Sequence, residues 1–68
     1  MQEAKIKIEG MTCGGCTASV TRVLEALPGV GFVDVSLERN EAAVRFDPAH
    51  TDLTTLKRTI EAAGYRVP

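Results

Sequence analysis

The sequence predicts an α+β fold built from two strand–helix–strand halves. Residues 5–9 alternate polar and apolar side chains, as a half-buried strand does, and a helical stripe of apolar residues follows them. Residues 33–37 and 43–46 repeat the alternation on either side of a polar connection, which predicts a hairpin. A second amphipathic helix and a short final strand follow. Two halves of about thirty residues each, joined through a hairpin, are typical of a split βαβ arrangement.

The first half of the chain contains one predicted strand and one predicted helix. Ile6 and Ile8 alternate with charged residues, so the first strand should turn one face to the core, and Gly10 should end it. From Cys16 onward, apolar residues recur at helical spacing and form one inward stripe: Val20, Val23, Leu24 and Leu27. Pro28 and Gly29 should end this helix, because proline cannot continue it and glycine accepts a left-handed conformation.

The second half begins with the predicted hairpin. Val33, Val35 and Leu37 should share one face of its first strand. In the next strand, Val44 and Phe46 should face the core while Arg45 points to water, and Asp47-Pro48 should stop the ladder.

A second helix should begin at an N-cap formed by Thr51 or Asp52. Its inward residues are predicted from their spacing to be Leu53, Leu56, Ile60 and Ala63. Gly64 occupies the expected C-terminal glycine position, and residues 65–67 should form a short final strand.

Composition limits the class of protein. With 68 residues, 44% of them apolar and 25% charged, the chain has the balance of one ordinary globular domain spanning residues 1–68. The net charge of −1 leaves no basic excess for a phosphate backbone, and aromatic residues are only 4% of the chain, so nucleic acid is a poor candidate partner. No Ser-His-Asp set, phosphate loop or paired-carboxylate site is visible, so we do not expect an enzyme.

The amino terminus shows neither a basic segment followed by an apolar one nor an apolar run of membrane-spanning length. We therefore expect a cytoplasmic protein that does not insert into a membrane. In a reducing compartment, two cysteines favour metal or redox chemistry over a structural disulfide.

The two cysteines, Cys13 and Cys16, stand three residues apart between the first strand and the first helix. Such a pair lets two thiolates reach one soft metal ion. Cys16 should fall in the first helical turn, where unpaired backbone N–H groups and the helix dipole favour an ionised thiol. Gly14 and Gly15 add little bulk, so the loop can bend tightly around an ion and another protein's sulfur can approach.

The motif Gly-Met-Thr-Cys-x-x-Cys at residues 10–16 resembles that of the heavy-metal-associated domain family. This family includes small copper chaperones and the amino-terminal modules of copper-transporting P-type ATPases. The resemblance covers essentially the whole chain and extends to residues 27–30, 33–37, 46–48 and 63–65. It implies a ferredoxin-like βαββαβ sandwich, in which two helices cover one face of a four-stranded antiparallel sheet, with one exposed soft-metal site.

The resemblance also implies roles around the metal loop. Met11 should be a buried support whose sulfur does not ligate, and the Thr12 hydroxyl should serve the loop's hydrogen bonding. Tyr65 stands where bacterial copper chaperones of the family commonly carry a tyrosine beside the loop, so its ring should shield the sulfurs and tune them. The single histidine, His50, should be a solvated loop residue.

Two thiolates without a third nearby ligand suit Cu(I), and also Hg(II) and Ag(I), while Zn(II) would be held weakly. The expected function is that of a copper chaperone that passes Cu(I) by ligand exchange to a partner Cys-x-x-Cys domain. That partner would be the metal-binding domain of a copper-transporting P-type ATPase or a copper-sensing regulator, with Arg22 as a candidate docking contact. We expect a monomer without metal, and two copies can share copper through four cysteines.

Three alternatives remain open from the sequence. The chain can be a metal-binding domain of a copper-transporting P-type ATPase, or it can be a mercury(II) carrier, although carriers of that kind are usually exported. A thiol-disulfide oxidoreductase would use Cys13 as nucleophile and Cys16 as resolving thiol. The motif lacks the flanking aromatic residue and proline of thioredoxin-like sites, which disfavours this third alternative.

Overall fold

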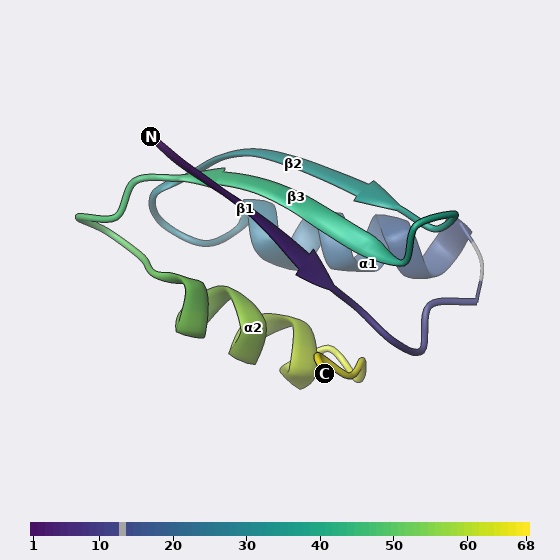
Figure 1. Cartoon of the computed structure of the whole chain (residues 1–68). Helices are drawn as coiled ribbons and strands as arrows, with labels where there is room; N and C mark the ends of the chain where they lie inside the picture. Colours follow the sequence, from purple (N-terminus) through teal and green to yellow (C-terminus); the bar gives the residue numbers. More distant parts are fainter. Residues whose placement is uncertain (13) are drawn as a thin grey trace.

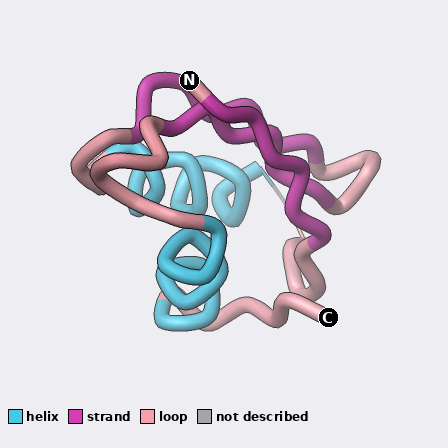
Figure 2. The backbone as a smooth tube through the Cα atoms, turned by 60° about the vertical axis from the view of Figure 1, so that its left-hand side comes forward, coloured by secondary structure: helices cyan, strands magenta, loops and turns pink. Residues whose placement is uncertain are grey.

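In the computed structural model, which describes residues 1–12 and 14–68, two helices cover one face of an antiparallel sheet (Figure 1). The elements in chain order are strand β1 (Gln2–Lys7), helix α1 (Gly14–Glu25), strands β2 (Val30–Ser36) and β3 (Glu41–Phe46), and helix α2 (Leu53–Ala62). Figure 2 shows both helices on the same side of the strands. The predicted α+β class and the position of the helices are therefore confirmed.

The sheet has the strand order β1-β3-β2, so β3 is its central strand. β1 pairs with β3 from Gln2↔Phe46 to Lys7↔Glu41 without a shift in register. β2 pairs with β3 on the other side, and a bulge between Val30 and Phe32 shifts that register. The predicted hairpin is present, and its second strand begins at Glu41 because this residue pairs on both sides.

The expected final strand is only partly present among the described residues. Beyond β1, Glu9 and Arg66 form an isolated antiparallel bridge. Their backbones exchange two hydrogen bonds, from Glu9 N–H to Arg66 O at 2.7 Å and from Arg66 N–H to Glu9 O at 2.9 Å. Residues 65–67 thus lie where a fourth strand would pair with the continuation of β1, but they add one bridge rather than a regular strand.

The core lies between the sheet and the two helices. Ten hydrophobic residues from β1, α1, β3, α2 and the segment after β1 form its buried cluster: Ile6, Ile8, Met11, Val20, Leu24, Ala42, Val44, Phe46, Leu56 and Ile60. Within the described part of the chain, no polar or charged residue is buried. The predicted alternation in β1 and β3 and the central residues of both helical stripes are confirmed by this cluster.

The predicted strand position of Leu37 and the predicted inward position of Leu53 are wrong. Leu37 is 38% exposed, because β2 ends at Ser36 and residues 37–40 form the turn, in which Asn40 takes a φ of 52°. Leu53 is 40% exposed, because it is the first residue of α2 and lies one turn before the packed stripe begins at Leu56.

The start of α2 confirms one of the two predicted caps. The Asp52 carboxylate accepts a hydrogen bond from the Thr55 backbone N–H at 2.8 Å. This bond lowers the pKa of Asp52 below its ordinary value, because it stabilises the ionised form.

Neither helix in residues 1–12 and 14–68 has the length and hydropathy needed to cross a membrane.

Candidate metal centre

The chain leaves the sheet through Gly10, which has a φ of 99°. This left-handed conformation is one that side chains with a Cβ rarely adopt, so glycine suits the turn. The turn directs Met11 into the core, where it is only 7% exposed. Met11 is therefore a packing residue, as expected for a support of the loop, and its predicted lack of metal ligation stays a prediction.

Cys16 lies in the first turn of α1 and is half-buried against the core. Its Sγ is 3.8 Å from the Thr12 Oγ1, a distance at which either atom can donate a hydrogen bond to the other. The first turn of α1 carries no acidic residue. The positive end of the helix dipole is therefore not neutralised by a carboxylate from its own first turn, and a thiolate at this position is favoured.

The glycines of the motif leave this end of the helix open. Gly14 and Gly15 are exposed, and among the described residues beyond its chain neighbours and its own helix backbone, none has an atom within 4 Å of the position that a Cβ on Gly14 would occupy. The Thr17 hydroxyl donates to the Gly14 carbonyl at 2.8 Å and ties down the same turn. The surface around Cys16 is therefore accessible to a large thiol-bearing partner while its backbone is held.

Tyr65 lies beside the entrance to the loop. A Cβ built on Gly10 would be 3.8 Å from the Tyr65 Cδ1, so the ring edge lies close to this glycine. Tyr65 is half-buried and packs against the core cluster. The structure thus brings Tyr65 next to the loop, as the resemblance implied, and its effect on the sulfurs stays a prediction.

The first cysteine of the motif, Cys13, lies outside the described residues. Of the two cysteines predicted to bind the metal, the structure therefore describes only Cys16. Among the remaining 67 positions, the structure gathers no group of three histidine, cysteine, aspartate or glutamate side chains that could hold a metal.

The single histidine lies far from this site. His50 belongs to the connection between β3 and α2, at the end of the molecule opposite the loop that precedes α1 (Figure 1). Its Nδ1 is 2.9 Å from an Asp47 carboxylate oxygen. The pKa of Asp47 is lowered, first by the hydrogen bond from the Ala49 N–H and then by His50. The position of His50 on an exposed loop agrees with the sequence prediction.

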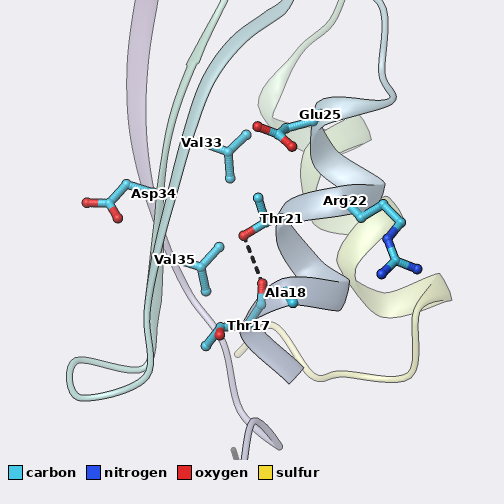
Figure 3. A pocket seen from close by; sticks show the side chains of 8 residues that line it. All are labelled: Thr17, Ala18, Thr21, Arg22, Glu25, Val33, Asp34 and Val35. Carbon is cyan, nitrogen blue, oxygen red and sulfur yellow. Dashed lines mark hydrogen bonds between the residues drawn. The ribbon is translucent and has the colours of Figure 1, made fainter. Parts of the chain in front are cut away.

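The groove between α1 and β2 is a separate feature. It encloses about 450 Å³ and is lined by Thr17, Ala18, Thr21, Arg22, Glu25, Val33, Asp34 and Val35. Figure 3 shows Val33, Val35 and Thr21 facing the space between the two elements, while Arg22 and Asp34 point away from it. Arg22 is exposed on α1, so its predicted role as a docking contact is sterically open and stays a prediction.

Two details near the candidate centre could not be derived from the local pattern of residues. The Glu9–Arg66 bridge joins the chain's last segment to the residue before Gly10, and the Tyr65 ring lies close to Gly10. The only sequence signal for either was the alternation of apolar residues at positions 65 and 67, which is too short to predict a pairing partner.

Comparison with known proteins agrees with the motif and the fold. The model of the heavy-metal-associated domain matches residues 5–66. The mercuric transport protein periplasmic component of Pseudomonas fluorescens is 39% identical over 64 residues, which cover 94% of this chain and 70% of that protein. Copper-transporting ATPase 1 of Mus musculus is 42% identical over 64 residues, 94% of this chain but only 4% of the ATPase.

Solved structures give the same result. A structure described as the CopZ metallochaperone superposes with a TM-score of 0.96 at 33% identity, covering 98% of this chain and all of that one. The ferredoxin-like α+β fold, with two helices and a sheet, is thereby shown. With the family model matched over nearly the whole chain, the protein belongs to the heavy-metal-associated domain family.

Proposed function

We propose that the protein binds Cu(I) as cargo through the thiolates of Cys13 and Cys16 and passes it to a partner domain by ligand exchange. The observation that carries this proposal is the position of Cys16 in the first turn of α1, where a Cβ added to Gly14 would point into space left open by the described residues beyond its own turn. Relatives that are described as a metallochaperone and as a copper-transporting ATPase support copper as the metal.

The open surface favours an associative transfer. An incoming thiolate adds to the copper ion as a third ligand, and one of the two original cysteines then leaves. Soft thiolates suit Cu(I), which accepts low coordination numbers, whereas Zn(II) usually requires four ligands. The small residues around Cys16 let a second loop approach without moving side chains out of the way. No free ion is released at any stage.

A mercury carrier is the second candidate. The observation that favours it is the 39% identity to the mercuric transport protein of Pseudomonas fluorescens, which this chain matches over most of that protein's length. Hg(II) also prefers two thiolates. Parallel titrations with Cu(I) and Hg(II) against competing thiols distinguish the two candidates. The cargo is the ion that stays bound to the protein at the lower free concentration of that ion.

The remaining parts of the proposal follow from the same site. The protein acts without catalytic turnover, in the cytoplasm, and its partner is a metal-binding domain of a copper-transporting P-type ATPase or a copper-sensing regulator. It is monomeric without metal, and two copies can share copper at high loading. A thiol-disulfide oxidoreductase would reduce insulin faster than a Cys13→Ser/Cys16→Ser variant, and we expect no such difference.

Transfer between copies of the protein tests the proposal without a known partner. Unlabelled protein loaded with Cu(I) is mixed anaerobically with metal-free ¹⁵N-labelled protein, and native mass spectrometry follows the redistribution of copper. A chelator present in excess traps any released ion. We expect redistribution whose rate rises with the acceptor concentration, and no transfer to a Cys16→Ser acceptor. A rate independent of the acceptor, with all copper captured by the chelator, would refute ligand exchange.

A further inference from the structure

The carboxyl-terminal segment is attached at the entrance to the metal loop. The bridge between Glu9 and Arg66 consists of two backbone hydrogen bonds of 2.7 and 2.9 Å. Glu9 immediately precedes Gly10, the residue at which the chain turns toward Met11. The last residues of the chain therefore hold the backbone at the point where the loop begins.

Side chains of the same segment reinforce this attachment. Tyr65 and Val67 alternate with exposed Arg66, and both pack against the buried cluster that includes Met11. The Tyr65 ring also lies close to Gly10, since its Cδ1 would be 3.8 Å from a Cβ built on that residue. Residues 65–67 are thus held in two ways, by packing of Tyr65 and Val67 on the core cluster and by the backbone bridge to Glu9.

We propose that residues 65–67 form a clamp that fixes the entrance to the metal loop, so that opening of the Glu9–Arg66 bridge speeds metal release. Only the second part of this inference, faster metal release, rests on the proposed function. When the bridge opens, the turn at Gly10 loses its restraint, and Met11 can shift in the core. A looser loop holds Cys16 and its partner thiolate in the two-coordinate geometry for a smaller fraction of the time.

Two substitutions of Arg66 isolate the bridge. Arg66→Pro removes the N–H that donates to the Glu9 carbonyl, whereas Arg66→Ala keeps it. Both remove the same exposed charge, and Arg66→Pro in addition removes the backbone donor and fixes φ at this position. Loss of one backbone hydrogen bond corresponds to a change of about fivefold in an equilibrium constant. We therefore expect the Glu9 amide to exchange its hydrogen about fivefold faster in Arg66→Pro than in Arg66→Ala.

The metal-free protein provides the decisive readout for the clamp itself. The chain has two methionines, so methyl-labelled protein gives one signal from buried Met11 and one from Met1, which is 79% exposed. We expect the Met11 methyl signal to shift or broaden in Arg66→Pro, while the Met1 signal and the amides of central strand β3 stay unchanged. An unchanged Met11 signal beside a faster Glu9 amide would overturn the clamp.

The rate of metal release tests whether opening of the Glu9–Arg66 bridge is coupled to loss of copper. We expect Cu(I) to pass to a competing chelator about fivefold faster from Arg66→Pro than from Arg66→Ala, in proportion to the bridge opening. Equal release rates from the two variants, with the Met11 signal altered, would overturn the coupling. If the unsubstituted protein retains no Cu(I), the proposed function fails, and the Met11 and Glu9 signals still decide whether the clamp exists.

Discussion

Replacing Met11 separates its packing role from a role in metal binding. Met11 is 7% exposed within the core cluster, so Met11→Ala should lower the free energy of unfolding by about 2–5 kcal/mol. Met11→Leu keeps most of the volume and should cost less than about 1.5 kcal/mol. Because small domains are marginally stable, the alanine variant would lose a large share of its total stability.

The assay combines urea unfolding of the metal-free protein with an anaerobic competition titration for Cu(I). Met11→Leu removes the thioether sulfur, so it should bind Cu(I) as tightly as the unsubstituted protein if that sulfur only packs. Leu24→Ala, at a fully buried position on α1, controls for destabilisation without any sulfur being lost. A tenfold weaker Cu(I) affinity in Met11→Leu, with stability preserved, would refute the assignment of Met11 as a support residue.

Three further predictions concern residues around the helices. Gly14→Val should slow copper transfer between copies while leaving affinity unchanged, because it adds bulk to open space beside Cys16; an unaltered transfer rate would contradict close approach at this glycine. His50→Ala should leave Cu(I) affinity unchanged in a competition titration, and weaker binding would show that the distant loop contributes a ligand. Asp52→Ala should lower the melting temperature more than Asp52→Asn, since asparagine can still accept from Thr55. The pKa of Asp52 is lowered in the folded state, so the ionised carboxylate stabilises the fold at pH values above the unfolded-state pKa. This stabilisation is lost as the pH falls through the folded-state pKa. Melting curves of Asp52→Asn should therefore lack this part of the acid dependence.

The periodicity of the sequence predicted the elements well where packing follows local pattern. Ile6, Val44 and Phe46 are buried as their alternation indicated, and Leu56 and Ile60 form the inner stripe of α2. These predictions succeeded because one face of each element is covered by the other layer, and a regular pattern then decides which residues are inside.

The predictions failed where an element ended. The sequence alternation continues through Leu37 and the helical spacing includes Leu53, but hydrogen-bond pairing ends β2 one residue earlier and α2 begins at Leu53. The final strand failed for a related reason: three residues carry little periodic signal, and their pairing with Glu9 depends on contacts far apart in sequence.

In the candidate site too, the features that follow from local sequence were predicted, and those that depend on contacts between distant segments were not. The spacing of the two cysteines and the glycines between them indicated a soft-metal loop at a helix start, and Cys16 is found there. Neither the closeness of Tyr65 to Gly10 nor the attachment of Arg66 to Glu9 could be derived from local pattern, because both depend on how the last segment meets the chain beyond β1. The resemblance to the family indicated the position of Tyr65, and the structure supplied its contact.

The most direct test of the central claim is an anaerobic titration of the reduced protein against a calibrated Cu(I) chelator, with Zn(II) in parallel and Cys13→Ser and Cys16→Ser as controls. The two-thiolate model predicts one Cu(I) held tightly per chain, far weaker Zn(II) binding, and loss of tight Cu(I) binding in each serine variant while the fold persists. Retention of tight Cu(I) binding by either serine variant would contradict the claim that both cysteines hold the metal.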